Sequence, residues 1–255
     1  MKNKTTTIAV AGKGGVGKTT TACGIIRVLK DNGITPILAV DADPNSTLSD
    51  ALGLEVKYTI AEILDESKDV NKQLPPGMNK QRYIEERFQM AIVESEGLDL
   101  FAMGHPDGPG CYCAPNSMLR AQLEALTPNY KAVVLDNEAG MEHISRRTSR
   151  RVDSLLVVSD PTIVGIRAAA RIRDIVRELK LETGKLGLIV NRVHNGLPDK
   201  SMEEINKLGL DLLGTVPLDD EISKRALEGS PIFDISSDSE FLKAINEITS
   251  KVISE

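Results

Sequence analysis

The chain has 255 residues, a formal net charge of -6 and a hydrophobic fraction of 41%. This length predicts one large domain or two small ones, with enough apolar residues for a sizeable core. The acidic balance disfavours a protein that coats DNA or anionic lipid. Aromatic residues are scarce, with no Trp, four Phe and four Tyr, which disfavours stacking on single-stranded nucleic acid. We therefore expect neither a nucleic-acid partner nor a membrane partner.

Targeting signals and a disulfide framework are not expected either. No run approaches the roughly 20 apolar residues of a membrane span. The segment Met1–Lys4 leads straight into a strand-like run, which leaves no room for a signal peptide. An odd count of three cysteines does not make a disulfide framework. We expect a cytoplasmic, reduced protein.

Apolar runs rich in β-branched residues alternate with helical patterns along the chain. This alternation predicts the α/β class, as a single domain over residues 1–255 with a mostly parallel sheet of about seven or eight strands and helices on both faces. A segment at about 65–96 fits the alternation worst and is interpreted as an insertion. The predicted strands are Thr5–Ala11, Ile34–Asp41, Leu98–Met103, Ala132–Asp136, Leu155–Ser159, Leu186–Asn191 and Leu212–Val216. The predicted helices are Thr19–Asn32, Lys80–Glu94, Thr162–Leu181 and an amphipathic C-terminal helix that includes Phe241–Ile248.

A glycine-rich loop follows the first predicted strand and opens the first predicted helix. Its pattern of Gly12, four residues, Gly17, Lys18 and Thr19 is that of a P-loop in the required strand–loop–helix context. Glycines let backbone N–H groups surround phosphate oxygens, and the helix N-terminus adds partial positive charge. Lys18 is expected to reach the β- and γ-phosphates, and the Thr19 hydroxyl to bind Mg²⁺. The full set expected to bind ATP or ADP here is Gly12, Gly14, Gly15, Val16, Gly17, Lys18, Thr19 and Thr20.

A second lysine, Lys13, stands directly after the first glycine of the loop. With this residue the loop resembles that of the deviant Walker A family of P-loop ATPases, which includes MinD- and ParA-like proteins. In that family the early lysine crosses a two-fold interface and touches the nucleotide of the partner subunit. The resemblance implies a homodimer in which Lys13 neutralises charge on the transferred phosphoryl group, as an arginine finger does. A solvated loop lysine is the alternative interpretation.

Carboxylates stand at the ends of two predicted strands, where a Mg·ATP site needs them. The segment Asp41-Ala42-Asp43-Pro44-Asn45 resembles switch I of the family. The resemblance implies that Asp43 orients or deprotonates the attacking water and that Asp41 lies near the water shell of the metal. The segment that begins at Asp136 resembles switch II and gives Asp136 the Walker B role. Helix capping is the alternative role for such carboxylates.

Three later residues resemble the adenine site of the family. Asn191 and Arg192 end the predicted strand that starts at Leu186, and Pro217 follows the next strand. A carboxamide can pair with both a donor and an acceptor on the adenine edge. We expect Asn191, Arg192 and Pro217 to contact the base, an expectation that depends on analogy of fold.

A Cys-x-Cys pair, Cys111 and Cys113, lies in a loop rich in proline and glycine. Thiolates two residues apart can face one soft metal ion, but two ligands are too few for a closed site. If Lys13 joins two subunits, two copies of the loop supply four thiolates, which suits Zn²⁺ or Ni²⁺. Free thiols are the alternative. The third cysteine, Cys23, lies on the apolar face of the first predicted helix and is expected to be a buried core thiol.

Together the P-loop, the Cys-x-Cys pair and the run Asp-Asn-Glu-Ala-Gly-Met-Glu-His from Asp136 to His143 resemble the CooC-type nickel-insertion ATPases, over essentially the whole chain. The resemblance implies an ATP- and metal-dependent homodimer that binds Ni²⁺ or Zn²⁺ and serves a client enzyme, carbon monoxide dehydrogenase or acetyl-CoA synthase. His105 and His143 are candidate transient ligands, although a lone histidine is more often structural.

Other branches of the same family remain alternatives. Scaffold ATPases that build iron–sulfur clusters usually carry Cys-x-x-Cys, whereas the spacing here is Cys-x-Cys. Membrane-positioning ATPases need a basic amphipathic tail, and the C-terminal segment here is amphipathic but not basic. DNA-partitioning ATPases need a positive surface, and the local cluster is Arg146, Arg147, Arg150 and Arg151. That cluster is a solvated face or a surface that docks the client. A binding module without ATPase activity is the non-enzymatic alternative.

Overall fold

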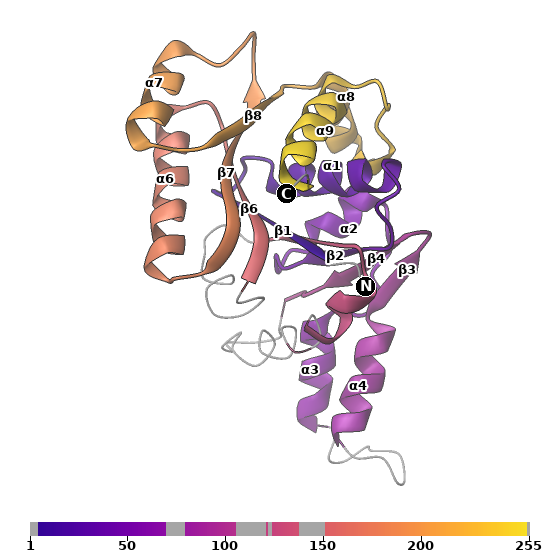
Figure 1. Cartoon of the computed structure of the whole chain (residues 1–255). Helices are drawn as coiled ribbons and strands as arrows, with labels where there is room; N and C mark the ends of the chain where they lie inside the picture. The colour runs from indigo at the N-terminus through magenta and orange to yellow at the C-terminus, as the bar shows by residue number, and fades with distance from the viewer. Residues whose placement is uncertain (1–4, 70–79, 106–120, 122–123, 138–150, 254–255) are drawn as a thin grey trace.

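The structure is a computed structural model that describes residues 5–69, 80–105, 121, 124–137 and 151–253. Its centre is an eight-stranded sheet in the order β3-β4-β2-β5-β1-β6-β7-β8 (Figure 1). Every neighbouring pair is parallel except β3 and β4. This arrangement confirms the expected single-domain, mostly parallel α/β fold. The strands are β1 (Thr6–Gly12), β2 (Ile37–Asp41), β3 (Ile92–Ser95), β4 (Leu98–Ala102), β5 (Ala132–Asp136), β6 (Arg151–Ser159), β7 (Glu182–Val193) and β8 (Leu212–Pro217).

Helices cover both faces of this sheet, as expected for parallel strands joined by crossovers. Alternate residues of β1 serve the two faces, so that Ile8 and Val10 enter one core while Ala9 and Ala11 enter the other. The first face is covered by α1 (Lys18–Asp31), α2 (Thr47–Leu52), α8 (Asp220–Glu228), the short 3-10 turn η4 (Ile232–Asp234) and α9 (Glu240–Ile253). The second is covered by α3 (Ile60–Asp69), α4 (Lys80–Met90), α6 (Ile163–Glu178) and α7 (Asp199–Leu208).

The carboxyl ends of the central strands bring the predicted site together. In the parallel ladder Val10 of β1 pairs with Asp136 of β5, and Asp136 also pairs with Asp41 of β2. Gly12, at the end of β1, pairs with Val158 of β6. The P-loop and both acidic segments therefore leave the same edge of the sheet from three adjacent strands, which is the usual ligand position in open α/β sheets.

One predicted helix boundary is wrong. The helical pattern expected over Lys80–Glu94 ends at Met90, and Ile92–Ser95 forms β3 instead. β3 is antiparallel to β4, with Ile92 opposite Phe101, and Gly97 at φ 70° makes the turn between them. β3 has only four residues, so its pattern is too short to be told apart from the end of the preceding helix. Its pairing with β4 is a tertiary contact, which local periodicity does not show.

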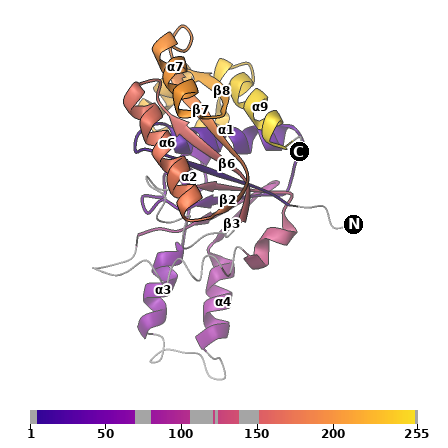
Figure 2. The ribbon, with the colours of Figure 1, turned by 60° about the vertical axis from the view of Figure 1, so that its left-hand side comes forward.

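The segment interpreted as an insertion contains a pair of helices. α3 and α4 lie side by side and extend away from the rest of the sheet (Figures 1 and 2). An ion pair between Arg87 and Glu66 joins the two helices, and the Arg87 guanidinium also lies 4.6 Å from the ring centroid of Tyr58. Thr59, just before α3, contacts Gly104, just after β4. The helix pair therefore starts on the side of the sheet where the parallel strands end and where the P-loop lies.

The C-terminal helix packs on its own domain, as predicted. Phe241, Leu242, Ile245, Ile248 and Val252 of α9 are buried in the core that contains α1 and β8. A side chain on Gly24 of α1 would lie 2.7 Å from Phe241, so α1 and α9 approach closely. No helix in the described part of the chain has the length and apolar character needed to cross a membrane.

Candidate nucleotide site

The P-loop connects β1 to α1, and its glycines are required by space and by backbone conformation. A Cβ on Gly12 would lie 2.4 Å from the Val158 carbonyl oxygen, which belongs to the neighbouring strand β6. A Cβ on Gly17 would lie 2.3 Å from Nδ2 of Asn191. Gly15 and Gly17 have φ values of 78° and 93°, where side chains are strained. The fold therefore holds this loop in a shape that only glycine permits.

The N-terminus of α1 is well suited to bind an anion. Its N-cap is Gly17, which provides no side-chain hydrogen bond, and its first turn contains no acidic residue. The N–H groups of that turn are therefore not capped by a side chain, and the helix dipole favours negative charge there. Lys18, the first residue of the helix, is only 8% exposed. Lys13 is exposed on the loop, which is the position that contact with a second subunit requires.

Asp41, at the end of β2, holds the acidic loop that follows it. One carboxylate oxygen accepts a hydrogen bond from the Asp43 N–H at 3.1 Å, and the other accepts one from the Leu48 N–H at 2.8 Å. Burial raises the pKa of Asp41 to about 7, and the negative charge of Asp136 adds to the increase while these two hydrogen bonds oppose it. Asp41 therefore holds the backbone of the loop between β2 and α2 in place.

Asp136, at the end of β5, is a buried carboxylate beside Lys18 and Thr19. Its side chain is fully buried, and among the described residues no hydrogen bond of ordinary geometry reaches either of its oxygens. Burial raises the pKa of Asp136 to about 6, while the nearby Thr19 hydroxyl and Lys18 lower it. Buried polar groups without partners are rare and costly. The oxygens of Thr19, Asp41 and Asp136 suit Mg²⁺, which prefers oxygen ligands and keeps part of its water shell.

Asp43 is half-exposed beyond these buried carboxylates. Its Oδ1 accepts hydrogen bonds from the N–H and from the side-chain Nδ2 of Asn45, both at 2.9 Å. These two bonds orient the carboxylate, because a side chain held at one oxygen has little rotational freedom. The role of Asp43 toward water, which the resemblance implied, stays a prediction.

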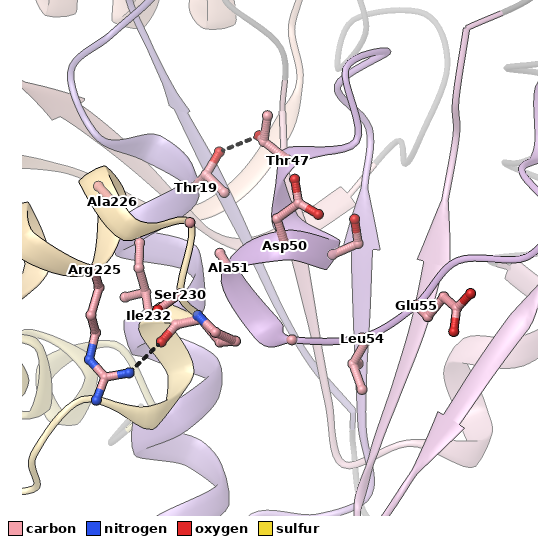
Figure 3. Close-up of a pocket in the computed structure, with 14 residues that line it drawn as sticks. Thr19, Thr47, Asp50, Ala51, Leu54, Glu55, Arg225, Ala226, Ser230 and Ile232 are labelled. Atoms are coloured by element: carbon pink, nitrogen blue, oxygen red, sulfur yellow. Dashed lines mark hydrogen bonds between the residues drawn. The ribbon is translucent and has the colours of Figure 1, made fainter.

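Two residues that the sequence did not single out also belong to the site. The Thr47 hydroxyl, at the start of α2, lies 3.1 Å from the Thr19 hydroxyl. Beside this pair a cavity of about 720 Å³ opens between α2 and the segment of α8 and η4 (Figure 3). Asn137 follows Asp136 and is fully buried, and its Nδ2 donates to the Val10 carbonyl at 2.9 Å. Both residues are polar and follow an acidic motif closely in the sequence, which is the signal that could have identified them.

The three residues predicted to contact adenine lie near one another at the ends of β7 and β8. Val193, two residues after Asn191, pairs with Pro217 at the end of β8. Asn191 is 5% exposed, and its Nδ2 donates to the Val16 carbonyl of the P-loop at 2.9 Å. Arg192 is exposed and has φ 57°. Contact of Asn191, Arg192 and Pro217 with the base stays a prediction.

The predicted metal ligands Cys111 and Cys113 lie outside the described residues, as do His143 and the arginines at 146, 147 and 150. Within the described ranges no group of three or more His, Cys, Asp or Glu side chains is arranged to hold a metal ion. Cys23 is fully buried, and its thiol donates to the Ala51 carbonyl at 3.3 Å. Burial raises the pKa of that thiol well above its usual range, and the expectation of a buried core thiol is confirmed.

Residues 7–232 match the family model described as the CobQ/CobB/MinD/ParA nucleotide binding domain. The chain belongs to this family. It is therefore a MinD/ParA-like P-loop ATPase, in agreement with the loop and strand-end geometry.

Relatives in this family cover nearly the whole chain. An uncharacterized ATP-binding protein of Methanocaldococcus jannaschii is 37% identical over 250 residues, which is 97% of this chain and 98% of the relative. The carbon monoxide dehydrogenase accessory protein CooC of Rhodospirillum rubrum is 30% identical over 247 residues, or 90% of each chain. Septum site-determining protein MinD of Helicobacter pylori is 26% identical over 259 residues, covering 96% and 89% of the two chains.

Solved structures share the fold. The MinD protein of Pyrococcus horikoshii, in complex with Mg-ADP, superposes with a TM-score of 0.71 at 21% identity, over 98% of this chain and 96% of that one. A ParA family ATPase from Chlorobium tepidum gives a TM-score of 0.73 at 19% identity, with coverage of 97% and 98%. At these identities the likeness establishes the architecture and nothing finer.

Proposed function

We propose that this protein is an ATP-hydrolysing nickel-insertion protein that delivers Ni²⁺ to carbon monoxide dehydrogenase or acetyl-CoA synthase. The observation that carries the proposal is the 30% identity to the Rhodospirillum rubrum accessory protein CooC over 90% of both chains. The Cys-x-Cys pair of Cys111 and Cys113 supports it, because thiolates are ligands for Ni²⁺ and Zn²⁺.

The chemistry of the nucleotide site is Mg-dependent hydrolysis of ATP to ADP and phosphate. The oxygens of Thr19, Asp41 and Asp136 would hold Mg²⁺ and its water ligands, and the bound ion would neutralise charge on the phosphates. Lys18 binds the terminal phosphates from the first turn of α1, and Thr19 supplies a hydroxyl to the metal. Asp43, oriented by Asn45, positions the attacking water and accepts its proton. Asp41 and Asp136 are the buried carboxylates whose negative charge would balance that of the bound metal ion.

Lys13 links this chemistry to metal binding. It is exposed on the loop, so it can reach across a two-fold axis to the triphosphate of a second copy. In the proposed cycle ATP closes the dimer, and each subunit contributes Cys111 and Cys113 to one four-thiolate site. Hydrolysis then opens the dimer and releases nickel toward the client enzyme. A slow turnover fits this cycle, because hydrolysis times a conformational change.

The other family branches fit less well. A membrane-positioning role needs an amphipathic helix that is available to lipid, and the apolar face of α9 is already buried against α1 and β8. An iron–sulfur scaffold is the closer alternative, since it also uses cysteines on a related ATPase. The spacing Cys-x-Cys favours the nickel proposal over that alternative.

A metal titration with matched variants tests the proposal. Purified protein would be titrated with Ni²⁺ and Zn²⁺ in the presence of ADP or a non-hydrolysable ATP analogue, and its mass followed by light scattering. We expect about one metal ion per dimer, with binding tightened by the ATP analogue. The Cys111→Ala/Cys113→Ala variant should lose this metal while keeping nucleotide affinity, and Cys23→Ala is the control that should change neither.

Two outcomes contradict the proposal. Nickel binding that survives the loss of both Cys111 and Cys113 excludes the shared thiolate site. A protein that stays monomeric with saturating ATP analogue and metal excludes assembly across the dimer. Assembly of an iron–sulfur cluster on the same two cysteines, without stable nickel binding, would favour the scaffold alternative.

A further inference from the structure

We propose that Asn191 is a positioning residue that clamps the P-loop in its phosphate-binding shape, whatever base the nucleotide carries. The evidence starts with one hydrogen bond, in which Asn191 Nδ2 donates to the Val16 carbonyl oxygen at 2.9 Å. Asn191 is 175 residues away from Val16 in the sequence and only 5% exposed. A bond between β7 and the P-loop that is shielded from water contributes more than one at the surface.

The irregular backbone at the end of β7 orients the Asn191 side chain toward the P-loop. The pairing of β7 with β8 shifts register between Val190 and Val193, so the residues between them leave the regular ladder. Arg192, inside this irregular stretch, has φ 57°, an uncommon conformation for a residue with a side chain. In this conformation its N–H donates to Oδ1 of Asn191 at 2.9 Å. The carboxamide is therefore held at both ends, and it cannot rotate without breaking a bond.

The P-loop has a glycine, Gly17, at the point where the Asn191 carboxamide approaches it. A Cβ on Gly17 would lie 2.3 Å from Asn191 Nδ2, which is closer than any real side chain tolerates. The glycine at this position thus serves two purposes: it permits φ 93° and it leaves room for the carboxamide. The approach of Asn191 to the loop is as tight as the packing of β6 against Gly12 at the other end of the loop.

The bond has a direct consequence for phosphate binding. In a trans peptide unit the carbonyl and the N–H point in opposite directions. By holding the Val16 carbonyl, Asn191 therefore turns the N–H of Gly17 away from itself and fixes the plane of that peptide. The N–H groups of a P-loop form the phosphate cradle. Because Gly17 provides no side-chain cap for α1, the clamp replaces the capping contact that commonly fixes a helix start.

This role differs from contact with the adenine base and is compatible with it. A carboxamide has two donor hydrogens and two acceptor lone pairs on its oxygen. The Val16 carbonyl takes one hydrogen and the Arg192 N–H takes one lone pair. One donor and one acceptor remain, which is the pair that the adenine edge would use. A test of the P-loop role therefore needs a ligand that binds the phosphate loop but has no base.

Inorganic tripolyphosphate separates the two roles because it has no base. Calorimetric titration with Mg-tripolyphosphate would compare the parent protein with Asn191→Ala and with Asn191→Leu, which keeps the branched shape but has no donor. We expect the affinity of both variants to fall about two- to tenfold, as the loss of one hydrogen bond predicts. Asn246→Ala is the matched control, since Asn246 is exposed on α9 and its side-chain oxygen accepts a hydrogen bond from the exposed Asn32.

A tripolyphosphate affinity that stays within twofold of the parent for Asn191→Leu overturns the proposal. Amide hydrogen exchange gives an independent measurement on the nucleotide-free protein: exchange over residues 14–19 should accelerate in both variants while α9 stays unchanged, and unchanged exchange in the loop would also overturn it. The proposal rests on the nucleotide site alone. Its failure is distinguishable from failure of the nickel proposal, because no nickel, client or dimer enters the assay.

Discussion

The hydroxyl oxygens of Thr19 and Thr47 lie 3.1 Å apart, so one hydrogen bond joins the first turn of α1 to the first residue of α2. The next residue, Leu48, donates its N–H to Asp41. The preceding residue, Ser46, has φ 50°, and its buried hydroxyl oxygen has no hydrogen-bond partner within the part of the chain that the structure describes. The start of α2 is therefore connected to α1 and to the end of β2, and it carries local backbone strain at Ser46.

This relationship predicts a role for the Thr47 hydroxyl in magnesium dependence. Thr47→Val keeps the shape of the side chain but removes the oxygen that faces Thr19. We expect the affinity for ADP in the presence of Mg²⁺ to fall about two- to tenfold, because one hydrogen-bonding oxygen of the metal surroundings is lost. The affinity for ADP in EDTA should stay unchanged. Thr47→Ser, which restores the hydroxyl, should recover the parent behaviour, and an equal loss with and without Mg²⁺ would assign Thr47 to packing alone.

The proposed role of Lys13 predicts that its replacement lowers the rate of ATP hydrolysis without changing the affinity for ADP. Lys13→Gln should lower kcat for ATP hydrolysis by about 10³-fold or more, because charge supplied in trans to the transferred phosphoryl group has effects of that size. It should also abolish the dimer formed with the ATP analogue, while ADP affinity stays near that of the parent. Steady-state kinetics and light scattering measure the two effects. Lys200→Gln, an exposed lysine on α7, is the control, and hydrolysis by Lys13→Gln at the parent rate would refute the role in trans.

The buried carboxylate of Asp136 predicts a specific pH dependence for the nucleotide-free protein. The pKa of Asp136 is about 6 in the folded protein and 3.8 without the fold, so the folded state binds a proton more tightly. The stability from this proton is complete below about pH 4 and is lost as pH rises through about 6. Asp136→Asn, which is always neutral, should therefore raise the unfolding free energy at pH 8 by about 1–3 kcal/mol.

Thermal unfolding between pH 5 and pH 8 measures this effect. The difference between Asp136→Asn and the parent should shrink as pH falls, because the parent carboxylate becomes neutral. Mg-ADP should stabilise the parent strongly and the variant weakly. Asp211→Asn, which changes an exposed carboxylate directly before β8, should show no such dependence. A variant that is less stable than the parent at pH 8 would show that Asp136 has a compensating partner in the folded protein.

The environment of Cys23 predicts that this thiol is silent in native assays. The side chain is fully buried, and burial raises its pKa, so the reactive thiolate is scarce. In the Cys111→Ala/Cys113→Ala variant, an aromatic disulfide reagent at pH 8 should release no colour until denaturant is added, and then one equivalent. Rapid reaction in the native variant would contradict the packing of α1 against α2 and would complicate thiol counting in the metal assays.

Much of the nucleotide site was predictable from local sequence. The P-loop pattern has fixed spacing, and Asp41 and Asp136 directly end apolar runs, so parallel strands had to bring them to one edge. The β3 strand was missed because four residues at a sheet edge carry too short a pattern to distinguish from a helix. Thr47 and Asn137 were missed because their importance lies in contacts with Thr19 and Val10, which are far from them in the chain.

The sequence by itself determined the fold class, the phosphate loop and the order of acidic residues, because each depends on short-range spacing and on alternation of apolar runs. Only the tertiary structure decided that Asn191 holds the Val16 carbonyl, that Thr47 contacts Thr19, and that Asp136 is fully buried beside Lys18 and Thr19. These facts depend on where the ends of non-adjacent strands and helices meet. These contacts, and the burial of Asp136, arise from the packing of the whole sheet and its helices. Local sequence patterns do not contain that information.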